Sequence, residues 1–151
     1  MVIGKTFVFK GVIVKVFLLF VAVLLFAVPG FSQWVTHQEA EDTVKSVLSK
    51  IVPAYGTVED KHGYYELEFK LIYNGMIISE AEKNINRSSE KTTEELLQEF
   101  KEELDENLAK AKITHTYYDR EDNEWEIQLF LPNIDISDID IDGTTGRILP
   151  D

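Results

Sequence analysis

The chain contains no cysteine, and its first 38 residues contain no acidic side chain. Without cysteine there is no disulfide, no thiolate metal ligand, no thiol nucleophile and no lipid attachment at a cysteine. An uninterrupted apolar run of about 20 residues, the length of a membrane-spanning helix, is also missing. Lysine and arginine do not cluster, which argues against binding to nucleic acid and to anionic membrane surfaces. The 151 residues suffice for one domain or two very small ones.

The N-terminus is basic and then apolar. Three lysines fall within the first 15 residues, and a run of 13 apolar residues, "VFLLFVAVLLFAV", covers 16–28. Pro29 and Gly30 follow, and Gly30 with Ser32 forms a small-x-small pattern before Gln33. This order is typical of a signal peptide, so we predict cleavage after residue 32 and export to the periplasm or the extracellular space. The alternative is an uncleaved N-terminal anchor that tethers the domain to a membrane.

Residues 33–151 are strongly acidic. They carry 12 basic and 27 acidic side chains, a formal charge of −15. A charge of this sign suits a well-solvated surface, a cationic protein partner or calcium. An exported domain without disulfides must be held together by its hydrophobic core alone.

The sequence resembles itself at an offset of 60 residues. The segment "YELEFKL" (65–71) aligns with "WEIQLFL" (125–131), and Gln38-Glu39 aligns with Gln98-Glu99, without a gap. We interpret this as an internal duplication, with repeat one at about 36–84 and repeat two at about 93–150.

Each repeat predicts a helix followed by strands. Apolar residues at three- and four-residue spacing predict helices over about 36–52 and about 93–112, each opened by a Thr-x-x-Glu capping box, and Pro53 is expected to end the first. Apolar residues alternate with charged ones in 65–71 and 125–131, which predicts antiparallel strands with one wet face. The predicted fold is α+β: two helix-strand-strand-strand repeats with the helices packed on one face of antiparallel sheet.

The C-terminal "DIDIDGTTGRIL" (138–149) has two interpretations. As a calcium loop, Asp138, Asp140 and Asp142 would ligate through their side chains, and Gly143 would follow at the sixth position. The twelfth position is Leu149, which cannot ligate, and no helical pattern flanks the segment. As a strand, Ile139 and Ile141 point into the core, the aspartates point to solvent, and glycines at 143 and 146 supply positive φ in the turn. We favour the strand, with calcium as the alternative.

The isoleucines of this region change phase. Ile134 and Ile136 have even numbers, whereas Ile139 and Ile141 have odd ones. Because side chains alternate strictly along a strand, this shift predicts a bulge or a short corner at Ser137-Asp138.

The stretch "IDIDGTTGRIL", together with the preceding helix and the "NEWEIQL" strand, resembles the C-terminal hairpin of PepSY domains. The resemblance covers about 93–149, and "AEKNINR" replaces the turn motif in the first half. The chain therefore looks like a tandem PepSY-like arrangement with a degenerate first copy, similar in fold to the beta-lactamase inhibitor protein. The resemblance implies a non-catalytic exported domain that inhibits or modulates a peptidase.

No catalytic constellation is recognisable in the sequence. His37, His62 and His115 fall in a helix start, a turn and a strand, and none has the i,i+4 partner of a zinc helix. Gly-x-Ser-x-Gly and phosphate-binding glycine loops are absent. We therefore predict a binding module rather than an enzyme, with a protein partner such as a peptidase. A calcium-dependent module and a membrane-tethered structural domain are the alternatives.

Overall fold

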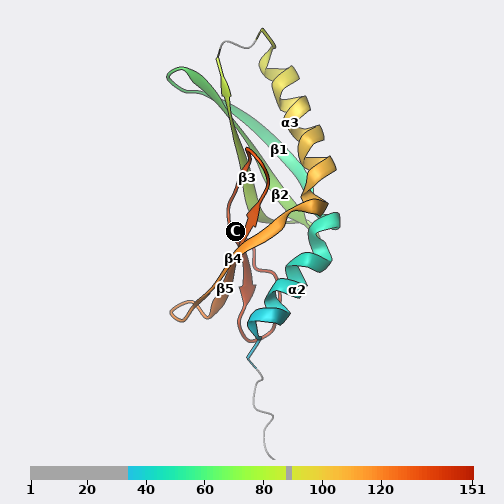
Figure 1. The fold of residues 1–151 in the computed structure, drawn as a ribbon, viewed down its shortest axis with the longest axis vertical. Coiled ribbons are helices and arrows are strands. Elements are labelled where there is room, and N and C mark those ends of the chain that lie inside the picture. Colours follow the sequence, from blue (N-terminus) through green and yellow to red (C-terminus); the bar gives the residue numbers. More distant parts are fainter. Residues whose placement is uncertain (1–33, 88–89) are drawn as a thin grey trace, which may run out of the picture. The chain divides into compact units, whose positions relative to one another are not determined.

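A computed structural model describes residues 34–87 and 90–151, so the predicted leader at 1–32 lies outside the described residues. The chain runs through two helix-and-strand series (Figure 1). The helical elements are α2 (His37–Val47), η1 (Leu48–Lys50), α3 (Thr93–Asn107) and η2 (Leu108–Lys110). The strands are β1 (Val52–Asp60), β2 (Tyr64–Tyr73), β3 (Met76–Asn86), β4 (Lys112–Asp119), β5 (Glu124–Phe130), β6 (Asp135–Ile136) and β7 (Ile139–Asp142).

Two antiparallel sheets form the body of the unit from Trp34 to Asp151. The first sheet has the order β1-β2-β3-β6, and the second has the order β4-β5-β7. Both helices lie on one side of the strands, α3 against β1 and β2, and α2 against β4 and β5 (Figure 1). The α+β class is as predicted, with the strands divided between two sheets.

Both helices begin at the predicted capping boxes. The Thr36 hydroxyl accepts from the Glu39 backbone N–H at 3.3 Å, and the Glu39 carboxylate accepts from the Thr36 N–H at 2.8 Å. Thr92 and Glu95 repeat the arrangement at the start of α3. Each helix then tightens into a final 3₁₀ turn.

The predicted helix ends were too late. The first helix ends at Lys50, and Pro53, expected to terminate it, lies inside β1 opposite Leu71. Proline disfavours the helical conformation of the residue before it, so Val52 is already extended. The second helix ends at Lys110 rather than 112, because Lys112 pairs with Phe130 and begins β4.

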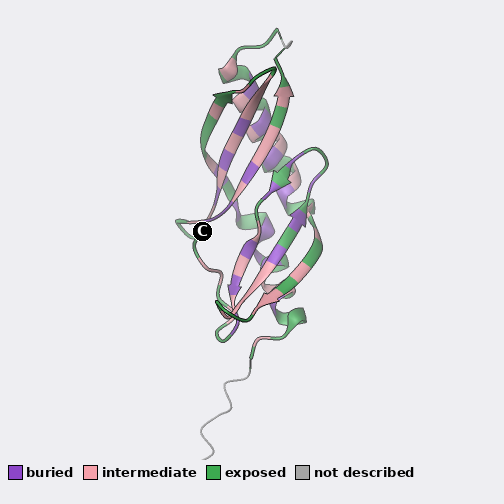
Figure 2. Cartoon of the chain, turned by 90° about the vertical axis from the view of Figure 1, so that its left-hand side faces the viewer, coloured by how far each residue is buried: buried purple, intermediate pink, exposed green. Residues whose placement is uncertain are grey.

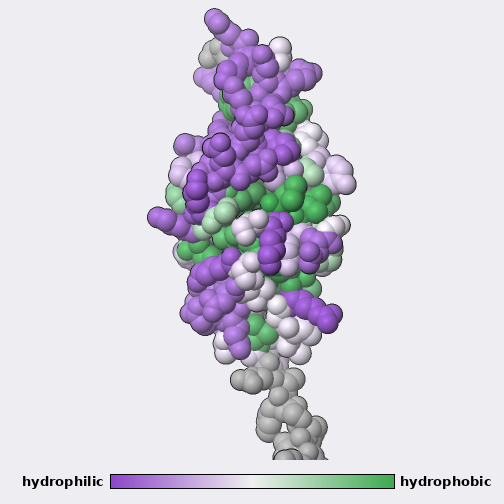
Figure 3. Space-filling model, turned by 90° about the vertical axis from the view of Figure 1, so that its right-hand side faces the viewer, coloured by the Kyte–Doolittle hydropathy of each residue, from purple (hydrophilic) through white to green (hydrophobic). Residues whose placement is uncertain are grey.

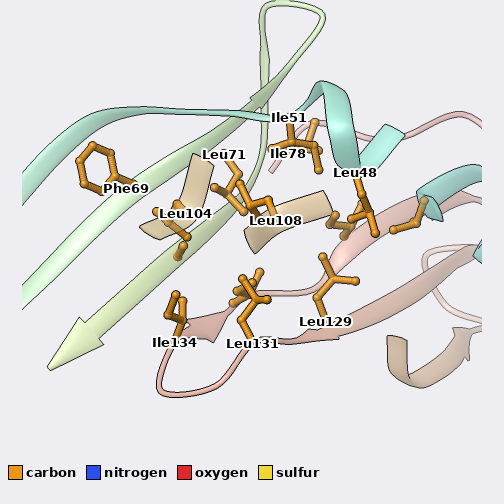
Figure 4. Close-up of a cluster of buried hydrophobic side chains, with 14 of the residues drawn as sticks. Leu48, Ile51, Phe69, Leu71, Ile78, Leu104, Leu108, Leu129, Leu131 and Ile134 are labelled. Atoms are coloured by element: carbon orange, nitrogen blue, oxygen red, sulfur yellow. The ribbon is translucent and has the colours of Figure 1, made fainter. Parts of the chain in front are cut away.

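The apolar stripes of both helices meet the apolar faces of both sheets in one core (Figure 4). Val44 and Leu48 from the first helix, and Leu104 and Leu108 from the second, are buried. Leu71, Ile127 and Ile141 from the strands are buried as well. The alternation predicted for β2 and β5 therefore places their aliphatic residues under the helices.

Corresponding elements recur at the 60-residue offset. The 3₁₀ turns at 48–50 and 108–110 lie 60 residues apart, and β1 corresponds to β4. The pairing register shifts between Ala54 and Thr57 in β1, and between Ile113 and His115 in β4. The chain thus contains two similar helix-and-sheet units, and the first strand of each is bulged in its first half.

The phase shift at Ser137 marks a passage between the sheets. Before it, Ile136 pairs with Ala81 of β3 in the first sheet, and after it Ile139 pairs with Ile127 of β5 in the second. Ser137 is held by β3, because its N–H donates to the Glu80 carbonyl at 2.9 Å and its carbonyl accepts from the Ser79 hydroxyl at 2.6 Å. The predicted corner is confirmed.

Within the described part of the chain, no helix has the length and apolar character needed to cross a membrane.

Candidate binding face

The sheets leave one side uncovered by helices, and we call it the open face. Figure 2 views the molecule from the strand side, where partly buried residues alternate with buried ones along the strands. The helical side is largely hydrophilic, with a hydrophobic band across its middle (Figure 3). The side chains of the open face are therefore the ones that alternate with the core residues of each strand.

Carboxylates of the second sheet form two rows across the strands of the open face. In one row Tyr117 of β4 pairs with Glu126 of β5, which pairs with Asp140 of β7. In the next row Asp119 pairs with Glu124, which pairs with Asp142. Like charges directly opposite each other in a sheet are destabilising.

No lysine or arginine among the described residues forms a salt bridge with Glu124, Glu126 or Asp140. Burial, reinforced by Glu124, Asp138 and the C-terminal Asp151, raises the pKa of Asp140 from an ordinary value of 3.8 to about 6. Burial and neighbouring carboxylates also raise the pKa of Glu126 and of Glu124. In all three groups the charged form is therefore less favourable than in an exposed carboxylate.

The open face of the first sheet is acidic too, but lysines neutralise part of it. Lys70 bonds Glu68 at 2.8 Å and also pairs with Glu80, which faces it across β2 and β3. Glu82 pairs with Glu68 on one side and Asp135 on the other, without a lysine of its own among the described residues. Burial, together with Glu66, Glu68, Asp135 and Glu80, raises the pKa of Glu82.

The three aspartates of the predicted alternative metal loop have different surroundings. Asp138 precedes β7, whereas Asp140 and Asp142 are within it, so the strand interpretation is confirmed. One oxygen of Asp142 accepts from the Thr144 N–H at 3.0 Å, and from the Thr145 N–H at 2.6 Å and hydroxyl at 2.8 Å. These bonds lower the pKa of Asp142 and use its carboxylate to close the turn.

The two glycines of this turn have different roles. Gly146 has a φ of +69°, as expected, but Gly143 is not in the positive-φ region, so that part of the prediction was wrong. A Cβ at Gly143 would lie 2.7 Å from the Asn123 carbonyl oxygen. Gly143 is therefore needed because the β4–β5 turn approaches closely, and its N–H donates to that same carbonyl at 2.8 Å.

One other group of carboxylates converges, and no side-chain spacing in the sequence indicated it. Among the described residues, ligand oxygens of Glu68, Glu80 and Glu82 lie within 4.8 Å of one another. They come from two strands that pair only in the folded sheet, so the register of β2 against β3 brings them together. Lys70 already supplies a positive charge to two of the three.

The aromatic and histidine residues are divided between core and surface. Tyr117 is 61% exposed and Phe130 51% exposed, and both belong to the open face of the second sheet. Tyr118 instead points the other way and packs on Trp125, with ring centroids 5.0 Å apart. His37, His62 and His115 lie on α2, in the β1–β2 turn and on β4, and among the described residues no cluster of possible metal ligands contains any of them.

Comparison with protein-family models, curated proteins and solved structures found no match to this chain. The resemblance to PepSY domains therefore remains a prediction from the residues that carry it.

Proposed function

We propose that this protein is an exported, non-catalytic binding module whose open face engages a basic region of a partner protein. The observation that carries the proposal is the unneutralised row Glu126–Asp140 and its neighbour Glu124. Their raised pKa values mean that a cation brought to this face removes repulsion already present in the free protein. The net charge of −15 over 33–151 adds long-range attraction for such a partner.

The partner class that we propose is a peptidase or another protein of the cell envelope. The PepSY-like C-terminal hairpin and the predicted leader support this choice. Mass spectrometry of the protein from its own cells checks export, because cleavage gives an N-terminus at Gln33 and an uncleaved anchor gives Met1. Hydrolysis of a chromogenic peptide by a serine peptidase and by a zinc peptidase, with and without the chain, checks modulation.

A charge-neutralised variant tests the face itself. The double variant Glu126→Gln/Asp140→Asn removes two carboxylates of one row, and Glu102→Gln/Glu106→Gln removes two exposed carboxylates of α3 as a matched control. The probe is an oligolysine peptide, with binding to the full chain measured by calorimetry at several salt concentrations. We expect the open-face variant to bind about tenfold more weakly and with a shallower salt dependence, and the α3 variant to bind like the wild type. Equal losses in both variants would show that net charge, rather than the open face, attracts the peptide.

A further inference from the structure

The outer edge of β4 is open. β4 is the last strand of the second sheet, and its backbone pairs only with β5. Apart from that ladder, no backbone hydrogen bond joins β4 to another described segment. An edge strand with unpaired N–H and C=O groups is a template for adding a further strand.

The equivalent edge of the first sheet is protected. β1 contains Pro53, and its bulge holds Tyr55 at a φ of +53°. Proline and bulges are devices by which proteins block edge pairing. β4 is bulged too, between Ile113 and His115, but it contains no proline and no residue of positive φ, and its register is continuous from His115 to Asp119. The two units thus differ in the accessibility of corresponding strands.

The side chains beside the open edge determine what kind of strand fits. A strand added next to β4 continues the row Tyr117–Glu126–Asp140 and the row Asp119–Glu124–Asp142. A lysine or arginine in the first row would lie over the exposed Tyr117 ring and reach toward Glu126. On the other side of the strand α2 lies against β4, and the Thr116 hydroxyl donates to Glu41 of α2 at 3.1 Å, so we expect small side chains to fit best there.

We infer that the β4 edge takes up an extended segment of a partner protein, in which lysine or arginine alternates with small residues, as an additional antiparallel strand. This inference rests on the proposed function and specifies how the basic partner is held: by backbone hydrogen bonds to β4 and by charge on the open face. Lys112 begins β4 and Arg120 follows its last residue, so we expect the positive charges of the partner beside the middle of the strand. A second copy of this chain is disfavoured, because two copies that each carry a formal charge of −15 over 33–151 repel each other.

The test uses three peptides and the full chain. The first alternates lysine with serine, the second has the same composition in scrambled order, and the third is the first with every second backbone nitrogen methylated. Methylation removes N–H donors from one edge of the peptide and leaves its charge unchanged. We expect the alternating peptide to bind at least about tenfold more tightly than the methylated one, because several backbone hydrogen bonds are lost. Amide hydrogen exchange should slow in β4 on binding, and not in β1.

Matched variants locate the site. Tyr117→Lys places a charged residue of the kind that blocks edges on β4, and Thr57→Lys makes the same change at the equivalent, exposed position of β1. We expect Tyr117→Lys to weaken binding about tenfold and Thr57→Lys to change it less than about twofold. Equal binding of the methylated peptide would overturn strand addition and leave the proposed function standing. No binding by any of the peptides would overturn both. If sedimentation showed that the wild type is a dimer and that Tyr117→Lys is a monomer, the β4 edge would bind a second copy of the chain, and the inference would be overturned.

Discussion

At the scale of single residues, the carboxylates of the second sheet are the side chains that most clearly lower the stability of the fold. Asp140 is partly buried, is adjacent to other carboxylates and has no lysine or arginine paired with it among the described residues. Natural proteins retain such costs where a surface has a use beyond folding, because binding sites are selected for function rather than for stability.

Removing the charge of Asp140 should therefore stabilise the protein. We expect Asp140→Asn to raise the free energy of unfolding at pH 7 by up to about 1 kcal/mol, the scale of cross-strand charge effects. The gain should shrink near pH 5, where Asp140 of the folded wild type is already protonated, since its pKa is about 6. Urea unfolding at both pH values measures the difference, with exposed Glu106→Gln on α3 as the control. A destabilised Asp140→Asn at pH 7 would contradict the repulsion argument.

The residues that could be predicted from the sequence are those fixed by periodicity. Leu104 on α3 and Ile127 on β5 are buried because a 3.6-residue or two-residue period places them on an apolar face. The row Glu126–Asp140 could not be predicted, because it depends on which residues of two strands pair. A shift of one residue in that register would exchange the core and solvent faces, and the sequence spacing alone does not specify the partner.

At the scale of elements, the starts of helices were predictable and their ends were not. A capping box is a local signal, in which a threonine hydroxyl and a glutamate carboxylate satisfy backbone N–H groups three residues apart. The ends of the helices depend on strand pairing instead. Val52 and Lys112 pair with other strands, although the helical spacing of apolar residues reaches as far as their neighbours. The corner at Ser137 could be predicted from the shift between even- and odd-numbered isoleucines. That shift does not indicate that β6 joins the sheet of the first unit.

The capping box of α3 gives a direct prediction for an element. Thr92→Ala removes the hydroxyl that accepts from the Glu95 N–H at 3.2 Å, and we expect the protein to lose about 1 kcal/mol of stability. Thr93→Ala is the matched control, because Thr93 is the first residue of α3 and its hydroxyl contacts only the exposed Glu94 side chain. Urea unfolding monitored by far-ultraviolet circular dichroism compares the two. Equal stability of both variants would mean that the box contributes nothing to folding.

At the scale of the whole molecule, two sets of carboxylates act on stability in opposite directions as the pH changes. Those of the open face, Asp140, Glu124, Glu126 and Glu82, have raised pKa values. The folded state therefore binds protons more tightly than the unfolded state, and stability rises as the pH falls through the folded pKa values. Asp142, Glu41 and the capping glutamates have lowered pKa values. Their contribution is complete above the unfolded pKa and is lost as the pH falls further.

The two sets of carboxylates together predict a maximum of stability below neutral pH, between about pH 4.5 and 6. The upper limit follows from the pKa of Asp140 at about 6, and the lower limit follows from the ordinary carboxyl range of roughly 4 to 4.5. Urea midpoints of the full chain from pH 4 to 8 at constant ionic strength measure the curve. Asp140→Asn should weaken the dependence of the urea midpoint on pH above pH 5.5 and leave the loss of stability at acid pH unchanged.

Added salt should raise the urea midpoint at pH 7 more than at pH 5, since screening relieves the same repulsion that protonation removes. A midpoint that rises steadily from pH 5 to 8 would mean that the open face carries no repulsion for a basic partner to relieve, and would remove the support for the proposed function.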